Sequence, residues 1–183
     1  MNNLKLETIK INNITLKEFD CDDIKRLYEI GSNPNMCKYL NWGPYKNINE
    51  AILIAKEIFL KRPEEGLPIG YSIFYKNYMV GMIDYHTYNK KDNSIEIGYF
   101  LDENYWGLGI MTKSLKKCIE YAFNNLEVDR IIISSLIENE RSIKLINKFD
   151  FKYLEEKLID LGDHFGLAKY FYLDYKDCGC LKW

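Results

Sequence analysis

A predicted strand, a pair of glycines and a predicted helix follow one another between residues 94 and 126. Apolar residues on one face of residues 94–101 alternate with Glu96, Gly98 and Phe100 on the other, which is typical of a β-strand. From residue 110 to 126 apolar residues recur every three or four positions, as on one face of a helix. Gly107 and Gly109 stand between them and allow a tight turn. Because the first N–H groups of a helix and its dipole attract anions, this order predicts a phosphate-binding loop.

Two glycines before a helix are also compatible with a plain helix start. The preceding strand favours the phosphate-binding interpretation. An ATP- or dinucleotide-binding domain is disfavoured, because no Lys-Ser or Lys-Thr pair directly follows the glycines and the full GxGxxG pattern is missing.

Composition limits the class of protein. The 183 residues fit one domain, which we place at residues 1–176 with a C-terminal tail at 177–183. The net charge of −2 gives no general attraction to nucleic acid. No apolar run approaches the roughly 18–20 residues that span a membrane, and the N-terminus lacks the apolar core of a secretory signal. We therefore expect a cytoplasmic protein.

The cysteines predict neither a disulfide framework nor a metal site. The five cysteines are an odd number in a chain that is not small. Cys178 and Cys180 lie one residue apart without a second pair of ligands, which does not make a zinc site. We expect no bound metal and interpret these two residues as part of a frayed tail.

The whole chain predicts a mixed α/β domain of order β-α-α-β-β-β-α-β-α-β-β. Strands are expected at residues 8–15, 69–75, 78–85, 94–101, 131–133, 151–160 and 168–175, and helices at 21–30, 48–60, 110–126 and 139–148. Asp20 is the expected N-cap of the first helix. The run Ile131-Ile132-Ile133 is typical of a strand covered on both faces. Strand, helix and strand in succession predict a parallel pair with a right-handed crossover.

Four segments in order resemble the GNAT N-acetyltransferase superfamily, and more narrowly its ribosomal-protein N-terminal acetyltransferases. They are residues 36–44 (MCKYLNWGP), 95–101 (IEIGYFL), 105–112 (YWGLGIMT) and 139–142 (NERS) followed by Phe149-Asp150-Phe151. The resemblance covers nearly the whole chain. It implies an α+β fold with a mostly antiparallel twisted sheet around a central parallel βαβ unit. It also implies acetyl-CoA as cosubstrate and an amine as acceptor.

The resemblance also implies positions for the cosubstrate. The pyrophosphate would bind the loop of Trp106, Gly107, Leu108, Gly109, Ile110, Met111 and Thr112. The backbone of Tyr99, Phe100 and Leu101 would pair with the pantetheine arm, which Asn139 would also contact. Ser142 would protonate the departing thiolate. The tyrosine acid found in many relatives is replaced here by Ile146, and Asp150 stands where a glycine is usual.

Glu96 is the candidate general base. Its alternative role is that of an ordinary strand glutamate that reaches solvent, as most glutamates do. Attack on a thioester needs a neutral amine. At pH 7 an α-amine is about a tenth neutral, whereas a lysine is neutral in less than about one molecule in a thousand. A single carboxylate therefore suits an α-amine better than an unassisted lysine. Asn139 is likewise a natural helix N-cap, which alone would explain it.

The acceptor side is the least constrained part of the site. Trp42 and Tyr85 are the expected acceptor-binding residues, with Tyr39, Tyr45 and His86 as further aromatic candidates. More of these five residues are expected to be ordinary core or rim residues than ligands. The sequence has no evident Cys-His pair that would indicate a covalent intermediate, so direct transfer is expected.

The leading acceptor is a protein N-terminal α-amine. A polyamine or aminoglycoside, or a non-catalytic acyl-CoA-binding module, remains open, as does the choice between monomer and homodimer.

Overall fold

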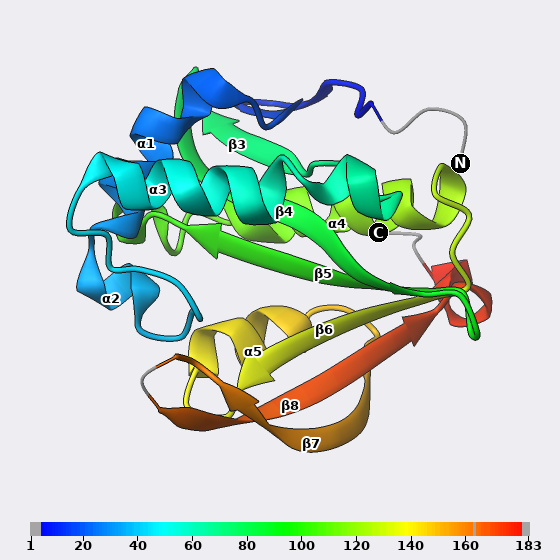
Figure 1. Ribbon diagram of the computed structural model, residues 1–183. Coiled ribbons are helices and arrows are strands. Elements are labelled where there is room, and N and C mark those ends of the chain that lie inside the picture. Colours follow the sequence, from blue (N-terminus) through cyan, green and yellow to red (C-terminus); the bar gives the residue numbers. More distant parts are fainter. Residues whose placement is uncertain (1–4, 163, 181–183) are drawn as a thin grey trace. The chain divides into compact units, whose positions relative to one another are not determined.

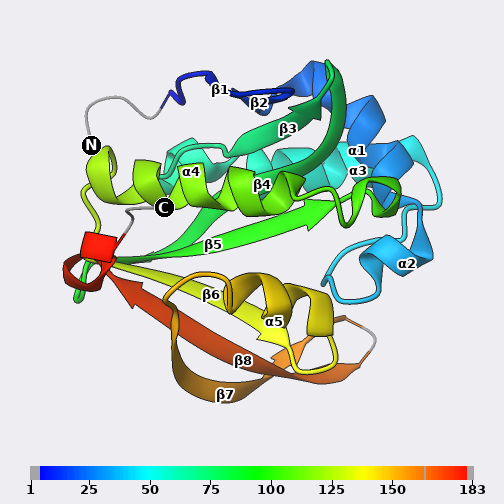
Figure 2. The same cartoon turned by 180° about the vertical axis from the view of Figure 1, so that it is seen from behind.

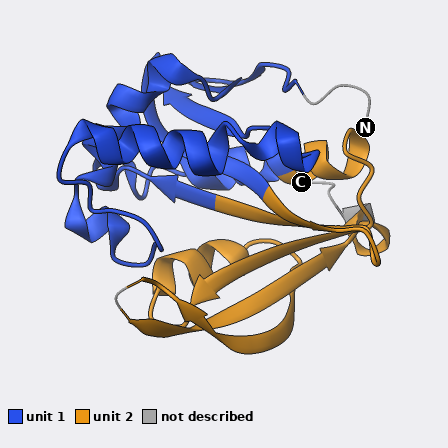
Figure 3. Cartoon of the chain, viewed as in Figure 1, with its two compact units in different colours: residues 1–85, 99–118 blue, residues 86–98, 119–183 orange. Residues whose placement is uncertain are grey.

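The structure is a computed structural model that describes residues 5–162 and 164–180 (Figure 1). The chain forms two compact units, coloured separately in Figure 3. Unit 1 contains residues 1–85 and 99–118, and unit 2 contains residues 86–98 and 119–183. Three elements run from one unit into the other: β4 (Tyr78–Asn89), β5 (Ser94–Leu101) and α4 (Ile110–Asn124). The prediction of one domain over residues 1–176 stays a prediction.

The strands follow the hydrogen-bonded order β1-β2-β3-β4-β5-β6-β8-β7. The remaining strands are β1 (Ile9–Ile11), β2 (Ile14–Glu18), β3 (Tyr71–Tyr75), β6 (Arg130–Leu136), β7 (Lys152–Asp160) and β8 (Phe165–Asp174). β5 and β6 pair in parallel, whereas β6 with β8 and β7 with β8 are antiparallel, as are the pairs from β1 to β4. The predicted mixed sheet with a parallel βαβ unit is confirmed.

Unit 1 places helices on both faces of its strands. Its helical elements are a 3-10 turn (Cys21–Asp23), α1 (Ile24–Gly31), α2 (Pro34–Cys37), α3 (Ile48–Ile54), a π-helical turn (Ala55–Phe59) and two further 3-10 turns (Arg62–Glu65 and Glu103–Tyr105). α3 lies in front of the strands in Figure 1, and the first half of α4 lies in front of them in Figure 2. The core on the α1 and α3 side gathers apolar side chains that include Leu27, Phe59 and Phe100.

Unit 2 is built on β6, β8 and β7. Helix α5 (Glu140–Ile146) lies over one face of these strands, toward the viewer in Figure 2. Along β6 Ile131 and Ile133 are buried, whereas Ile132 is only half-buried. The prediction that this strand is covered on both faces is therefore wrong, because the face of Ile132 also carries polar side chains.

Residues Tyr175–Cys180 form a 3-10 helix in which Cys178 is buried, so the predicted frayed tail does not begin at residue 177.

Other sequence expectations are corrected in detail. The strand predicted at residues 8–15 is a hairpin of β1 and β2, which turns at Asn12 with φ of 52°. The helix predicted at 48–60 changes from α to π geometry at Ala55. In β5 the alternation of buried and half-buried side chains changes after Gly98, where the chain passes from unit 2 to unit 1. Phe100 is buried against Trp42, with ring centroids 5.1 Å apart, whereas Tyr99 is half-buried.

No helix among residues 5–162 and 164–180 combines the length and apolarity that a membrane crossing needs.

Candidate active site

The glycine loop of unit 1 has the backbone that the sequence predicts for an anion site. Gly107 and Gly109 have φ of 79° and 71°, a region that side chains rarely adopt. A Cβ atom added to either glycine would meet nothing within 4 Å, so space is open beside the backbone. The N–H of Lys113 donates to the Gly109 carbonyl at 3.2 Å, which opens α4. The N–H groups of residues 110–112 thus belong to the first turn, where an α-helix has no internal acceptors for them.

The side chains around this loop explain why it holds its shape. Ile110 and Met111 are buried and anchor the start of α4, whereas Leu108 is 55% exposed. A loop with buried anchors and an outward-facing backbone can approach an anion without rearrangement. These features fit an anion such as a phosphate group, with the backbone rather than side chains as donor.

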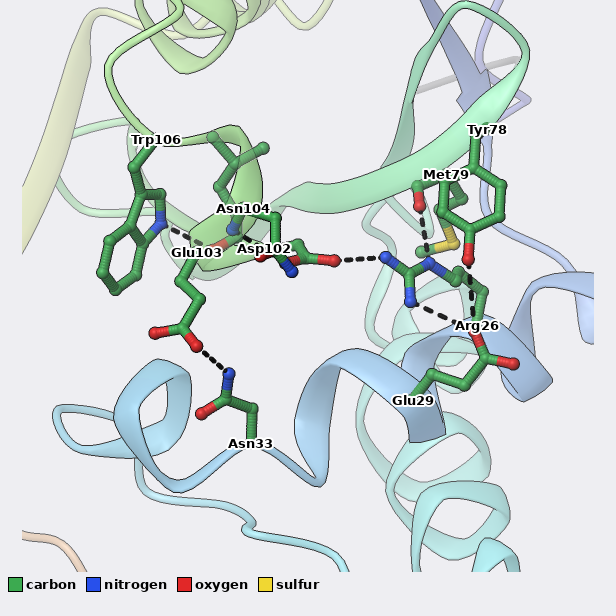
Figure 4. Close-up of polar contacts among 10 residues, drawn as sticks. Arg26, Glu29, Asn33, Tyr78, Met79, Asp102, Glu103, Asn104 and Trp106 are labelled. Atoms are coloured by element: carbon green, nitrogen blue, oxygen red, sulfur yellow. Dashed lines mark hydrogen bonds and ion pairs between the residues drawn. The ribbon is translucent and has the colours of Figure 1, made fainter.

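Polar contacts fix the segment that leads into the loop (Figure 4). The guanidinium of Arg26 on α1 contacts the Asp102 carboxylate, and its Nε donates to the Met79 carbonyl at 2.8 Å. The other Asp102 oxygen accepts from the backbone N–H and side-chain amide of Asn104 at 3.0 and 2.9 Å. Trp106 turns its indole N–H back to the Leu101 carbonyl at 2.8 Å. The chain from the end of β5 to the loop is therefore tied to α1 and β4.

A second contact joins the same segment to the turn after α1. The side-chain amide of Asn33 donates to Glu103 Oε1 at 2.6 Å (Figure 4). Asn33 is also the N-cap of α2, where its side chain accepts from the backbone N–H of Asn35. The segment around α2, where the acceptor-side residues were predicted, is thus hydrogen-bonded to the segment that precedes the loop.

Glu96 lies in unit 2 at the end of the parallel ladder between β5 and β6. The paired residues are Ser94–Glu96 with residues 130–132. The Ser134 hydroxyl donates to Glu96 Oε1 at 2.7 Å, and His86 Nδ1 lies 3.9 Å from Oε2. The Glu96 side chain is 14% exposed. It is therefore a half-buried carboxylate with a hydroxyl donor on one oxygen and an imidazole beside the other, not a freely solvated surface glutamate.

Tyr170 and Lys157 extend this group across the sheet. Tyr170 on β8 is the register partner of Ser134 on β6. Burial raises the pKa of Tyr170, and the charge of Glu96 raises it further, while Lys157 and the Ser134 hydroxyl act in the opposite direction. Lys157 Nζ lies 5.1 Å from the Tyr170 ring centroid and pairs with Glu155 at 2.6 Å. We call His86, Glu96, Ser134, Tyr170 and Lys157 the polar row.

Sequence reasoning had singled out only two members of the polar row, Glu96 and His86. Ser134, Tyr170 and Lys157 were missed because they come from β6, β8 and β7, whose order in the sheet differs from their order in the chain. The sequence signal that could have indicated Ser134 is its polar side chain directly after the apolar run Ile131–Ile133.

The backbone at Thr87, next to His86, is also unusual, since a φ of 52° is rare for a β-branched residue. Its hydroxyl lies 2.8 Å from His86 Nδ1 and helps orient that ring.

Helix α5 carries the other predicted residues of unit 2. Asn139 is its N-cap, and its side chain accepts from the Ser142 backbone N–H at 3.2 Å. This capping role is one that the sequence had left open. Ser142 is half-buried. Ile146, which replaces the tyrosine of many relatives, is fully buried, so that position holds a core side chain.

The acceptor-side predictions have different outcomes. Tyr85 is fully buried, and its hydroxyl donates to the Cys118 carbonyl at 2.9 Å. This burial does not support an acceptor contact, and the side chain belongs to the core of unit 1. Trp42 is half-buried and stacks on Tyr45 with centroids 5.5 Å apart. Burial raises the pKa of the Tyr45 phenol, and the side chain is almost completely enclosed. Trp42 and Tyr39 stay half-exposed candidates.

Among the described residues, no three His, Cys, Asp or Glu side chains are grouped so that they could hold a metal ion.

Comparisons with known proteins agree with this arrangement of elements. The family described as "Acetyltransferase (GNAT) domain" matches residues 13–152. An uncharacterized N-acetyltransferase, p20 of Bacillus licheniformis, is 30% identical over 152 residues, which cover 80% of this chain and 83% of that protein. The ribosomal-protein-serine acetyltransferase of Escherichia coli is 25% identical over 144 residues, or 74% of this chain and 78% of that one.

A solved structure supports the fold independently. The chain resembles that of RimL, an α-N-protein acetyltransferase of ribosomal L7/L12 in complex with coenzyme A. The TM-score is 0.80 at 20% identity, with 93% of this chain and 99% of that chain covered.

The family match over residues 13–152 and the fold therefore define an acyltransferase of the GNAT class. The chain belongs to the GNAT acetyltransferase family and is an acetyl-CoA-dependent N-acetyltransferase.

Proposed function

We propose that this enzyme transfers the acetyl group of acetyl-CoA directly to the N-terminal α-amine of a protein. The observation that carries the proposal is the half-buried carboxylate of Glu96, held by Ser134 on one oxygen. One carboxylate suffices for an amine that is already partly neutral at pH 7. The likeness to relatives named ribosomal-protein acetyltransferases supports the same class of acceptor.

In the proposed reaction the loop at residues 106–112 binds the pyrophosphate, and the backbone of residues 99–101 pairs with the pantetheine arm. The Leu101 carbonyl already accepts the Trp106 indole, which leaves Tyr99 and Phe100 as the better candidates for that pairing. Asn139, besides capping α5, would contact the same arm. These assignments follow the motif positions and the open space beside Gly107 and Gly109.

The chemistry needs one proton acceptor and one proton donor. The neutral amine attacks the thioester carbonyl, the C–N bond forms, and the C–S bond breaks as the tetrahedral intermediate collapses. Glu96 takes the proton that the nitrogen loses, directly or through a water molecule. Ser142 donates a proton to the leaving thiolate. Since a thiol has an ordinary pKa near 8.5, this second assistance contributes less than the first.

A thiol-release assay with acetyl-CoA tests the acceptor class. The panel contains peptides with free N-termini, the same peptides with blocked N-termini, and small amines such as a polyamine and an aminoglycoside. Turnover of the free peptides alone is the expected result. Turnover of the small amines alone would assign a small-molecule acceptor instead. Transfer that is unaffected by both Glu96→Gln and Ser142→Ala would contradict the proposed chemistry.

A further inference from the structure

We propose that Ser134 is a positioning residue that holds the Glu96 carboxylate in its working orientation, and that Tyr170 supports Ser134 from the neighbouring strand. The inference rests on the proposed role of Glu96 as base. It adds two residues from β6 and β8, and it gives a function to the polar row, which crosses five neighbouring strands.

The hydrogen bond to Glu96 has a defined direction. A serine hydroxyl carries one hydrogen, and Ser134 uses it in the 2.7 Å bond to Glu96 Oε1. This bond restricts the rotation of the Glu96 carboxylate. Tyr170 is the register partner of Ser134 on the neighbouring strand β8, so the two side chains lie on the same face of the sheet.

The hydrogen bond from Ser134 engages only one side of the carboxylate. Oε1 accepts from Ser134, whereas Oε2 faces His86 at 3.9 Å, which is longer than a hydrogen bond. Holding Oε1 fixes the plane of the carboxylate and leaves Oε2 to receive a proton. A general base must lie within hydrogen-bond reach of the proton it removes, so a fixed orientation acts directly on the rate.

The far end of the polar row is held as well. Tyr170 is half-buried on β8, and Lys157 on β7 lies over its ring. Lys157 in turn pairs with Glu155, whose backbone is in register with Tyr170. The charged groups that face Tyr170 are thus Glu96, Lys157 and Glu155. Since the strands themselves are paired by backbone hydrogen bonds, the row is supported along its whole length.

The first measurement tests the polar row without using activity. Tyrosines labelled with 13C at Cζ are titrated by NMR, and the Tyr170 signal is assigned by its absence in Tyr170→Phe. Because the charge of Glu96 raises the Tyr170 pKa, Glu96→Gln should lower it. Ser134→Ala should raise the Tyr170 pKa, because the Ser134 hydroxyl acts to lower it. Glu156→Gln is the matched control, since Glu156 pairs with Lys169 instead. An unmoved Tyr170 titration in both variants of the row would overturn the proposal.

The second measurement separates positioning from general damage. Ser134→Ala should lower kcat at least about tenfold while the KM for acetyl-CoA stays within about twofold. Ser134→Thr keeps the hydroxyl and should restore most of kcat. Tyr170→Phe should lower kcat less. Tyr172→Phe should leave kcat unchanged, because the ring of Tyr172, on the same strand as Tyr170, lies against the Arg130 guanidinium of β6.

The variants also distinguish failure of the proposed base from failure of the proposed positioning role. If Glu96→Gln keeps full activity, the assignment of Glu96 as base is wrong, whatever the titration of Tyr170 shows. If Glu96→Gln loses activity but Ser134→Ala and Tyr170→Phe both keep it, the base stands and the positioning role is wrong. Should Ser134→Ala fold poorly, Tyr170→Phe and Ser134→Thr carry the same comparison.

Discussion

Arg26 on α1 and Asp102 at the end of β5 form an ion pair whose side chains are 16% and 9% exposed. The pair lies at the base of the segment that leads into the glycine loop (Figure 4). The residues are far apart in the chain, and each also bonds a second group: Arg26 the Met79 carbonyl, and Asp102 the amide groups of Asn104. We infer that this pair sets where the loop begins.

Arg26→Ala should destabilise the protein by about 3 kcal/mol, because Asp102 would remain buried without its cation. It should also weaken coenzyme A binding, since the loop loses its fixed start. Urea unfolding and calorimetric titration with coenzyme A measure the two effects. Glu29→Gln is the control, because the exposed contact of Glu29 with Arg26 contributes only about 0.5 kcal/mol. A destabilised Arg26→Ala protein with unchanged affinity would show that the pair is structural only.

Gly109→Val should weaken coenzyme A binding about tenfold, while Leu108→Ala should change it less than about twofold. The first change forces a side chain into a left-handed backbone at a cost of about 1–2 kcal/mol and fills the space beside the loop. The second removes an exposed side chain and keeps every backbone N–H. Calorimetric titration of both variants with coenzyme A gives the comparison. Equal dissociation constants would contradict a backbone-based site.

Glu96→Gln should reduce kcat by about 10²- to 10⁴-fold, as expected for loss of a general base. Affinity for acetyl-CoA should stay within about twofold, since the loop supplies that binding. Steady-state rates and calorimetry on the same preparations check both statements. Glu156→Gln, an exposed glutamate on β7, should behave like the unmodified enzyme. Full activity in Glu96→Gln would return this residue to the role of a structural carboxylate.

Cys37 should stabilise the fold in a pH-dependent way. Its thiol donates to the Gly31 carbonyl at 3.2 Å, and burial raises its pKa to about 11. A raised pKa means that the stabilisation is complete below the ordinary thiol value and is lost as the pH rises toward 11. The stability difference between the unmodified protein and Cys37→Ala should therefore shrink by about 2 kcal/mol between pH 8 and 10.5. Cys21→Ala, at an exposed position, should show no such change. A constant difference for Cys37→Ala would contradict the linkage.

Local patterns in the sequence predicted most of the elements and one half of the site. Alternation placed β5 at its observed bounds, and the helical period placed α4. The positive φ values of Gly107 and Gly109 agree with the glycine turn expected between them. These features depend on neighbouring residues, which is why a single sequence reveals them.

The rest depends on contacts between distant residues. Ser134 and Tyr170 meet because β8 lies between β6 and β7, and no local pattern records that order. Arg26 and Asp102 are joined in the same way across unit 1. Tyr85 was expected at the acceptor, but the strand continues to Asn89 and buries it, with its hydroxyl satisfied by the Cys118 carbonyl. Aromatic residues alone do not distinguish a core position from a binding position.

The central claim, direct transfer to an N-terminal α-amine, is tested most directly by locating the acetyl group on a product. A peptide with one free α-amine and one internal lysine is incubated with acetyl-CoA and enzyme, and fragment mass spectrometry locates the modification. The account predicts acetylation at the N-terminus, abolished by Glu96→Gln. Acetylation confined to the lysine side chain would contradict it.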